Sequence, residues 1–179
     1  IAFNGTAAVR FGSSAYESAG RISETTRNIS LTGNVVFNPQ SRLSVQLNHN
    51  KDVIRTPYAS SDAGATYCYE TSGGTLISTS VNFKDYDDVL IDRNSYRNVG
   101  AGMSVEHPLK ENIRILGDVQ AQSKKYYDTE DGNDLQGVQF NTFLDYTGKK
   151  ALVNAGIRGR FQSGEKAFLD YSRIIPNIR

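Results

Sequence analysis

The sequence is poor in the residues that support several common classes of protein. Its 179 residues include one cysteine, two histidines, four prolines and no tryptophan. The single Cys68 excludes an internal disulfide framework and a cysteine-rich metal site. No run of eighteen apolar residues occurs, so a transmembrane helix is not expected. The chain opens at Ile1 without a charged-then-apolar leader, as we expect of a mature or excised product.

Charge of one sign is also lacking. Twenty Lys and Arg face nineteen Asp and Glu, which leaves a net charge of +1. A nucleic-acid-binding domain normally carries a strong basic field, so nucleic acid is not an expected partner.

Motifs for catalysis or cofactor binding are absent as well. No Gly-x-Ser-x-Gly elbow and no phosphate-cradling glycine loop occurs. His49 and His107 fall on the apolar register near strand ends, where a structural role is expected. The acidic stretch 128–134 lacks the glycine spacing and the closing glutamate of a calcium loop. The sequence therefore predicts no enzyme, no catalytic residue, no metal site and no cofactor.

What the sequence does have is glycine, aromatic residues and a strict two-residue period. It contains 16 glycines, ten tyrosines and eight phenylalanines. Apolar and polar residues alternate in eight segments, and no charge falls on the apolar side, which is typical of strands with one apolar face. The segments are 3–11, 29–37, 43–47, 77–83, 99–105, 113–121, 138–146 and 151–161.

Strand length and loop pattern indicate the architecture. The longer segments alternate for nine to eleven residues, whereas globular strands usually have about 5–6 and tilted membrane-spanning strands need about 9–11. Short turns are expected at 38–42, 72–74, 107–112 and 147–150. Long polar loops are expected at 17–27, 55–64, 85–94 and 127–134. With a short strand at 65–71 the count is nine, and 168–175 would be a tenth.

This alternation of short turns and long loops resembles the bacterial outer-membrane β-barrel class, a porin-like architecture, over nearly the whole chain. Aromatic residues expected near strand ends would form its interfacial girdles: Phe3, Phe11, Phe37, Phe83, Tyr146 and Phe161. The resemblance implies one domain over 1–179, an antiparallel up-and-down β-barrel of about 8–10 strands, complete or as a segment of a larger barrel. It also implies an outer-membrane location and a lipid bilayer as partner, alone or with other chains of a membrane assembly.

A soluble antiparallel β-sandwich has the same two-residue period. That alternative would be a secreted protein that binds or assembles through its long loops. Small residues on the apolar face, such as Gly33, Gly117 and Ala155, favour the barrel, because they fill a protein core poorly and cost little against fluid lipid.

In a barrel, the polar face would line the lumen. Its charged candidates are Arg10, Glu106, Arg114, Asp118, Lys124, Asp145, Arg158 and Arg160. In a narrow barrel the arginines at 114, 158 and 160 should pair with the three acids, because a half-buried charge needs a partner. The product would be a plugged anchor with recognition loops. In a wider barrel the same residues would line a transport or export pore that prefers anions or sugars.

Overall fold

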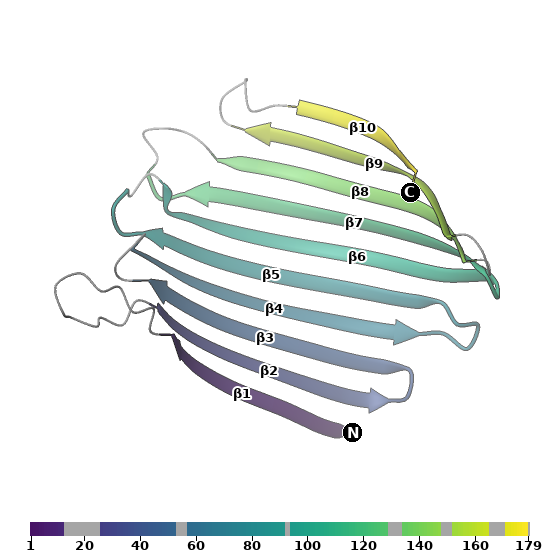
Figure 1. Ribbon diagram of the computed structural model, residues 1–179, viewed down its shortest axis with the longest axis horizontal. Coiled ribbons are helices and arrows are strands. Elements are labelled where there is room, and N and C mark those ends of the chain that lie inside the picture. The colour runs from purple at the N-terminus through teal and green to yellow at the C-terminus, as the bar shows by residue number, and fades with distance from the viewer. Residues whose placement is uncertain are drawn as a thin grey trace.

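The chain forms one antiparallel sheet in which ten strands follow one another in chain order (Figure 1). The computed structural model describes residues 1–12, 26–52, 57–91, 94–128, 134–147, 152–164 and 171–178. The first five strands are β1 (Ala2–Gly12), β2 (Thr26–Asn38), β3 (Ser41–Asp52), β4 (Tyr58–Glu70) and β5 (Leu76–Asp88). The other five are β6 (Tyr96–Lys110), β7 (Ile113–Tyr126), β8 (Leu135–Thr147), β9 (Leu152–Gly164) and β10 (Tyr171–Ile178).

The predicted up-and-down order and the long strands are confirmed, since nine of the ten strands have 11 to 15 residues. The predicted short strand at 65–71 is wrong. β4 begins at Tyr58 and pairs with β3 and β5 along its whole length. Its first half alternates small residues, Ala59, Ser61 and Ala63, on the apolar side, and this weak contrast resembles a polar loop.

The turns follow the predicted chemistry where the structure describes them. Pro39 and Gln40 join β2 to β3, and the Gln40 amide donates to Asn38 Oδ1 at 2.9 Å. Gly74, between β4 and β5, has a φ of 77°, a backbone conformation that glycine adopts without strain. The turn predicted at 107–112 is shorter, because β6 continues through a register shift to Lys110.

The register places apolar and polar residues on opposite faces of the sheet. One row runs across β2–β9 through Gly33, Val45, Ala65, Val81, Ala101, Ala121, Val138 and Phe161. The adjacent row runs through Thr32, Gln46, Gly64, Asn82, Gly100, Gln122, Gly137 and Gln162. The sheet therefore has one continuous apolar face and one continuous polar face.

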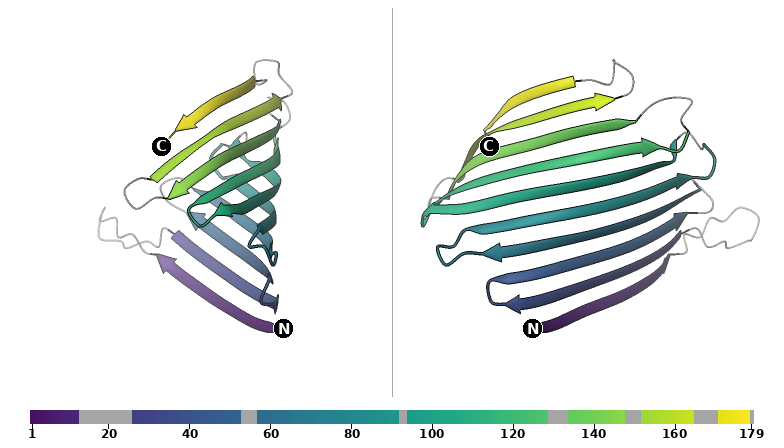
Figure 2. Two further views of the ribbon diagram at one scale, coloured as in Figure 1. Left: turned by 90° about the vertical axis from the view of Figure 1, so that its right-hand side faces the viewer. Right: turned by 180° about the vertical axis from the view of Figure 1, so that it is seen from behind.

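The sheet is not closed into a barrel. β1 pairs with β2 and β10 pairs with β9, and within the described residues neither end strand has a second neighbour. Two views show a single curved layer with β1 and β10 at opposite ends (Figure 2). The predicted barrel closure is thus absent, whereas the all-β antiparallel order holds.

No apolar side chain in the described ranges is buried, and the buried side chains there are polar: Ser41, Ser60, Ser95 and Asn141. Along β8, Val138, Leu144 and Tyr146 of the apolar face are exposed, whereas Gln139, Asn141 and Asp145 of the polar face are half-buried or buried. No helix in the described part of the chain is long and apolar enough to cross a membrane.

Candidate functional site: the concave polar face

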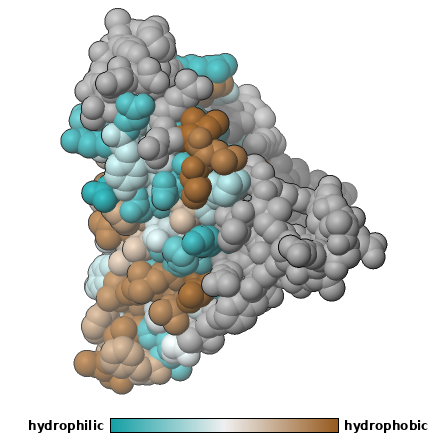
Figure 3. Space-filling view, turned by 90° about the vertical axis from the view of Figure 1, so that its left-hand side faces the viewer, coloured by the Kyte–Doolittle hydropathy of each residue, from teal (hydrophilic) through white to brown (hydrophobic). Residues whose placement is uncertain are grey.

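The polar face is the concave side of the sheet. A hollow of about 330 Å³ opens on it, whereas the apolar side offers shallow depressions around Leu47, Ala63 and Phe83. In the view onto the left-hand side of Figure 1, brown apolar residues are concentrated in the lower part of the coloured surface (Figure 3). We therefore call the two sides the concave polar face and the convex apolar face.

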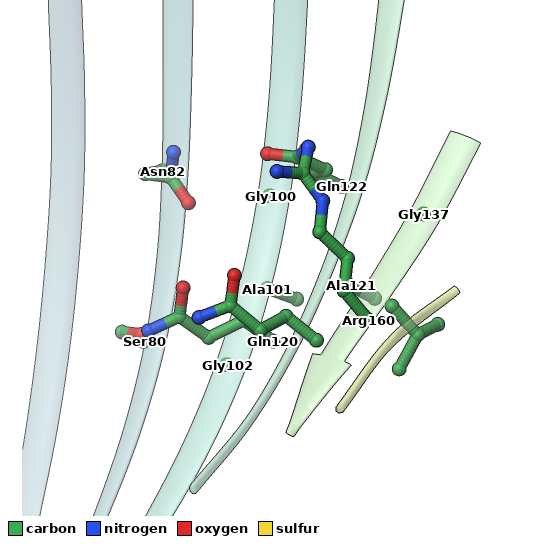
Figure 4. A pocket seen from close by; sticks show the side chains of 12 residues that line it. Ser80, Asn82, Gly100, Ala101, Gly102, Gln120, Ala121, Gln122, Gly137 and Arg160 are labelled. Atoms are coloured by element: carbon green, nitrogen blue, oxygen red, sulfur yellow. The ribbon is translucent and has the colours of Figure 1, made fainter. Parts of the chain in front are cut away.

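The hollow lies across the middle of β5–β9, and glycines provide its space. A Cβ atom on Gly100 would overlap the Asn82 side chain, and one on Gly102 would lie 3.0 Å from Ser80 Oγ. Amide side chains and Arg160 project around these glycines (Figure 4). The lining residues are Ser80, Asn82, Gly100, Ala101, Gly102, Gln120, Ala121, Gln122, Gly137, Val138, Gln139 and Arg160.

An ion-pair cluster lies toward the short-turn end of the concave face. Arg114 Nη1 is 2.6 Å from Glu106 Oε1, and its Nη2 is 3.6 Å from Asp145 Oδ2. Asn154 Nδ2 donates to the other Asp145 oxygen at 3.0 Å. The expected pairing of Arg114 is confirmed, because β7 places it directly opposite Asp145 on β8.

Arg158 bonds to an amide in place of the expected direct ion pair. Arg158 Nε donates to Asn141 Oδ1 at 2.8 Å, and Asn141 Nδ2 donates to Asp118 Oδ2 at 2.8 Å. Asn141 lies between Arg158 and Asp118 because it is opposite Arg158 on one side and Asp118 on the other. The Asn141 amide therefore links the arginine to the carboxylate. The contacts of Arg160 include a hydrogen bond from its Nη2 to Gln162 Oε1 at 3.0 Å.

Lys124 lies beside a ladder of four tyrosines at the long-loop end of the concave face. The ring centroids of Tyr58 and Tyr86 are 5.6 Å apart, those of Tyr86 and Tyr96 5.2 Å, and those of Tyr96 and Tyr126 5.9 Å. Lys124 Nζ is 3.7 Å from the Tyr96 centroid and donates to Tyr126 Oη at 2.6 Å. The cation is thus held by ring faces and a hydroxyl.

For Arg10, the eighth predicted lumen residue, the structure describes the backbone alone. Arg10 lies on β1 opposite Asn28, and its side chain is outside the described part of the chain. The structure therefore places the other seven candidates, Glu106, Arg114, Asp118, Lys124, Asp145, Arg158 and Arg160, on one face, in the separate clusters described above.

Charged residues lie on the convex face close to the long loops. Arg97 Nε is 3.7 Å from Asp85 Oδ1, and the Tyr127 hydroxyl also donates to Asp85. The Arg97 guanidinium lies 5.2 Å from the centre of the Tyr127 ring. The hydrogen bond to the Asp85 carboxylate raises the pKa of Tyr127 above its ordinary value. Tyr126 and Tyr127, neighbours in the sequence, therefore take part in clusters on opposite faces.

The remaining reactive residues have structural partners. His49 Nδ1 lies 3.0 Å from Ser61 Oγ, and His107 Nδ1 lies 2.8 Å from Thr75 Oγ1. Cys68 Sγ accepts a hydrogen bond from Ser78 at 3.4 Å. Within the described ranges, no group of three or more His, Cys, Asp or Glu side chains could hold a metal ion. Most of the acidic stretch 128–134 lies outside those ranges.

Sequence reasoning missed the hollow and the tyrosine ladder. Both depend on residues that the register brings together from strands distant in the sequence. Tyr58 and Tyr86 fell within the expected loops 55–64 and 85–94, so their positions on the polar face were hidden. The aromatic prediction also placed Phe83 near a strand end, whereas it lies near the middle of β5.

Comparison with protein-family models, with curated proteins and with solved structures finds no match.

Proposed function

We propose that this chain forms the wall of an outer-membrane β-barrel channel for hydrophilic solutes. The observation that carries the proposal is the inverted placement of residues: apolar side chains lie exposed on the convex side, and polar side chains gather on the concave side. A water-soluble fold buries its apolar face, whereas a membrane barrel turns that face toward lipid.

The proposed channel is wide rather than plugged. Ten strands form an open arc and do not meet, so further strands are needed to complete the circumference. Side chains nearly fill a barrel of about eight strands, whereas barrels of about 16–18 strands leave an aqueous passage. The hollow over Gly100 and Gly102 supports an open lumen, because the wall is thinnest there.

The outer edges of β1 and β10 have no neighbouring strand within the described residues, so the proposed wall needs further strands at both edges. Unpaired backbone N–H and C=O groups are not tolerated in hydrocarbon, so both edges must pair with further strands. Those strands come either from the same protein or from other chains of a membrane assembly.

The charge pattern gives the proposed channel a preference for anions. Arg114 has two carboxylate partners, whereas Arg158 and Arg160 donate to the amides of Asn141 and Gln162. Arginine keeps its charge at all physiological pH values, so Arg158, which donates to the Asn141 amide, contributes positive potential along the passage.

The lipid-facing surface can be tested with a fluorescent label. In a Cys68→Ser background, Val119→Cys places one thiol on the convex face, and the matched Gln120→Cys places it on the concave face. We expect a bimane at position 119 to be quenched by lipids brominated on their acyl chains, and a bimane at position 120 to escape this quenching. Equal quenching at both positions would contradict the proposal.

The same experiment separates the β-sandwich alternative. A second sheet covering Val119 would shield the label from brominated lipid, and the protein would stay monodisperse in buffer without detergent. The channel itself is tested by conductance across planar bilayers, where Arg158→Gln with Arg160→Gln should lower anion selectivity. The measurement uses the assembly that supplies the strands completing the wall, and absence of conductance there would exclude the channel.

A further inference from the structure

We propose that a groove on the convex apolar face binds one phospholipid whose head group carries both a phosphate and a primary amine, as in phosphatidylethanolamine. This inference rests on the proposed function, because the convex face meets lipid only if the sheet is a membrane wall. The lipid would be held at one place on that wall, whereas the rest of the convex face would contact lipids without selection.

The groove follows β4 on the convex face. Two depressions of about 330 Å³ each adjoin along this strand, and both are lined by Leu47, Ala63 and Phe83. The register places Ala63 between Leu47 on β3 and Phe83 on β5. Ala65, two residues further along β4, lines one of the depressions as well. Small side chains of β4 thus form the floor of the groove, and larger side chains of its neighbours form the walls.

The dimensions of the groove suit a single aliphatic chain. β3 and β5 lie about 9.5 Å apart across β4, whereas a helix with its side chains is about 10–12 Å wide. The floor from Ser61 to Ala65 is about 13 Å long at the rise of a strand. A bilayer has a hydrocarbon core of about 30 Å, so one leaflet provides about 15 Å. The groove is therefore long enough for most of an acyl chain and too narrow for a helix.

Polar side chains begin at the end of the groove nearest the long loops. His49 Nδ1 lies 3.0 Å from Ser61 Oγ, and both residues line the groove there. The next convex-face position on β4 is Ala59, near the start of the strand. Apolar floor, then hydroxyl and imidazole, is also the order of polarity from the acyl chain of a phospholipid to its ester groups.

Opposite charges lie on the two sides of Ala59. The register pairs Ala59 with Lys51 on β3 and with Asp87 on β5, and Arg27 holds the next position beyond Lys51, on β2. Lys51 is exposed and forms no ion pair with the described residues. Asp87 is also exposed, and its Oδ1 accepts a hydrogen bond from Ser95 Oγ, which leaves Oδ2 available. A basic side and an acidic side therefore flank this end of the groove.

This arrangement of charges selects the head group. The phosphate of a phospholipid accepts hydrogen bonds from Lys51, and a primary ammonium donates hydrogen bonds to Asp87. A quaternary ammonium has no N–H to donate, and a glycerol head group carries no positive charge. Phosphoethanolamine therefore complements both sides of the groove, whereas phosphocholine and phosphoglycerol each complement one.

The test uses the full chain in phosphatidylcholine vesicles with one tryptophan as the reporter, because the sequence has none of its own. Phe83→Trp places the indole on the wall of the groove, and Phe161→Trp places it on the convex face of β9, outside the groove. The vesicles contain a fixed fraction of phosphatidylethanolamine, phosphatidylcholine or phosphatidylglycerol brominated on the acyl chains. We expect phosphatidylethanolamine to be favoured about threefold at position 83, the scale of exposed charge pairs, and no preference at position 161.

The outcomes separate the groove from the wall. Equal quenching by the three lipids at position 83 would overturn the groove site and leave the lipid-facing wall intact. Strongest quenching by phosphatidylglycerol would show a simple attraction of anions and would also overturn the site. Absence of quenching at both positions would overturn the site and the membrane wall together.

Charge variants test the head-group contacts. In the Phe83→Trp protein, Lys51→Gln and Asp87→Asn should each remove most of the preference for phosphatidylethanolamine. Lys125→Gln removes an exposed charge from the same rim of the convex face, on β7, and should leave the preference unchanged. Equal losses in Lys51→Gln and Lys125→Gln would indicate an effect of net charge and overturn the assignment.

A filled groove tests the contact with the acyl chain. Ala63→Leu should reduce quenching by brominated phosphatidylethanolamine at position 83 to the level of phosphatidylcholine, because the larger side chain occupies the floor. Ala155→Leu adds the same volume on the convex face of β9 and should have no effect. Circular dichroism checks that both variants keep the sheet. An unchanged preference in folded Ala63→Leu would overturn the assignment of the acyl chain to the groove.

Discussion

The two faces of this sheet are formed by the same hydrogen-bonded strands, but their side chains make different kinds of contact. On the concave polar face, side chains contact one another through ion pairs, amide relays and stacked rings, as at Arg114, Asn141 and Tyr96. On the convex apolar face, aliphatic side chains such as Val45, Val81 and Ile157 stand exposed. Polar contacts thus dominate the concave face, whereas the exposed aliphatic side chains of the convex face would be stabilised by a covering medium.

The largest expected effect comes from placing a charge on each face at neighbouring positions. Val45→Arg should destabilise the protein in a bilayer by about 2–4 kcal/mol if the residue lies near the midplane, because the guanidinium enters hydrocarbon. Gln46→Arg, on the concave face, should change the free energy of unfolding by less than about 0.5 kcal/mol. Urea unfolding in lipid vesicles measures both. Similar losses for the two variants would contradict the division into lipid-facing and water-facing sides.

A smaller effect separates two glycines of the convex apolar face. A Cβ atom on Gly159 would overlap the Phe140 ring, whereas one on Gly33 meets no atom within 4 Å. Gly159→Ala should therefore cost about 1–3 kcal/mol through displacement of the ring, and Gly33→Ala should be close to neutral. Unfolding of both variants under one condition tests this. A neutral Gly159→Ala would show that Phe140 moves away without cost.

The smallest effect concerns the rim where the convex face ends. Because Tyr127 donates to Asp85, its pKa is raised, and the fold favours the neutral phenol. The resulting stability is present below the unfolded tyrosine pKa of about 10 and is lost as pH rises through the higher folded value. The absorbance difference between wild type and Tyr127→Phe should therefore titrate above pH 10. Titration at or below the ordinary value would contradict the hydrogen bond.

Much of the fold could be predicted because it is local in the sequence. Two-residue alternation indicated the strands, and Pro39 and the glycines at 73–74 indicated turns. β4 was predicted only in part, because Ala59, Ser61 and Ala63 give too little contrast between faces. Closure could not be judged from the sequence, since alternation is the same in a closed barrel, an open sheet and a sandwich.

The candidate site was predictable in its chemistry but only partly in its contacts. Arg114 and Asp145 could be paired from the signs of their charges, and the register confirms them. The interposition of Asn141 between Arg158 and Asp118 depends on a register that no single strand encodes. The tyrosine ladder has the same origin, because its four members come from four strands.

The sequential order of the ten strands also affects how such a protein could gain strands during evolution. Every pairing in the described sheet joins neighbours in the chain. A duplicated hairpin inserted at a loop would therefore add two strands without rerouting any other connection. It would extend both faces by the same alternation and widen the sheet by two strands. The architecture thus lets the width of the sheet evolve independently of the chemistry of each strand.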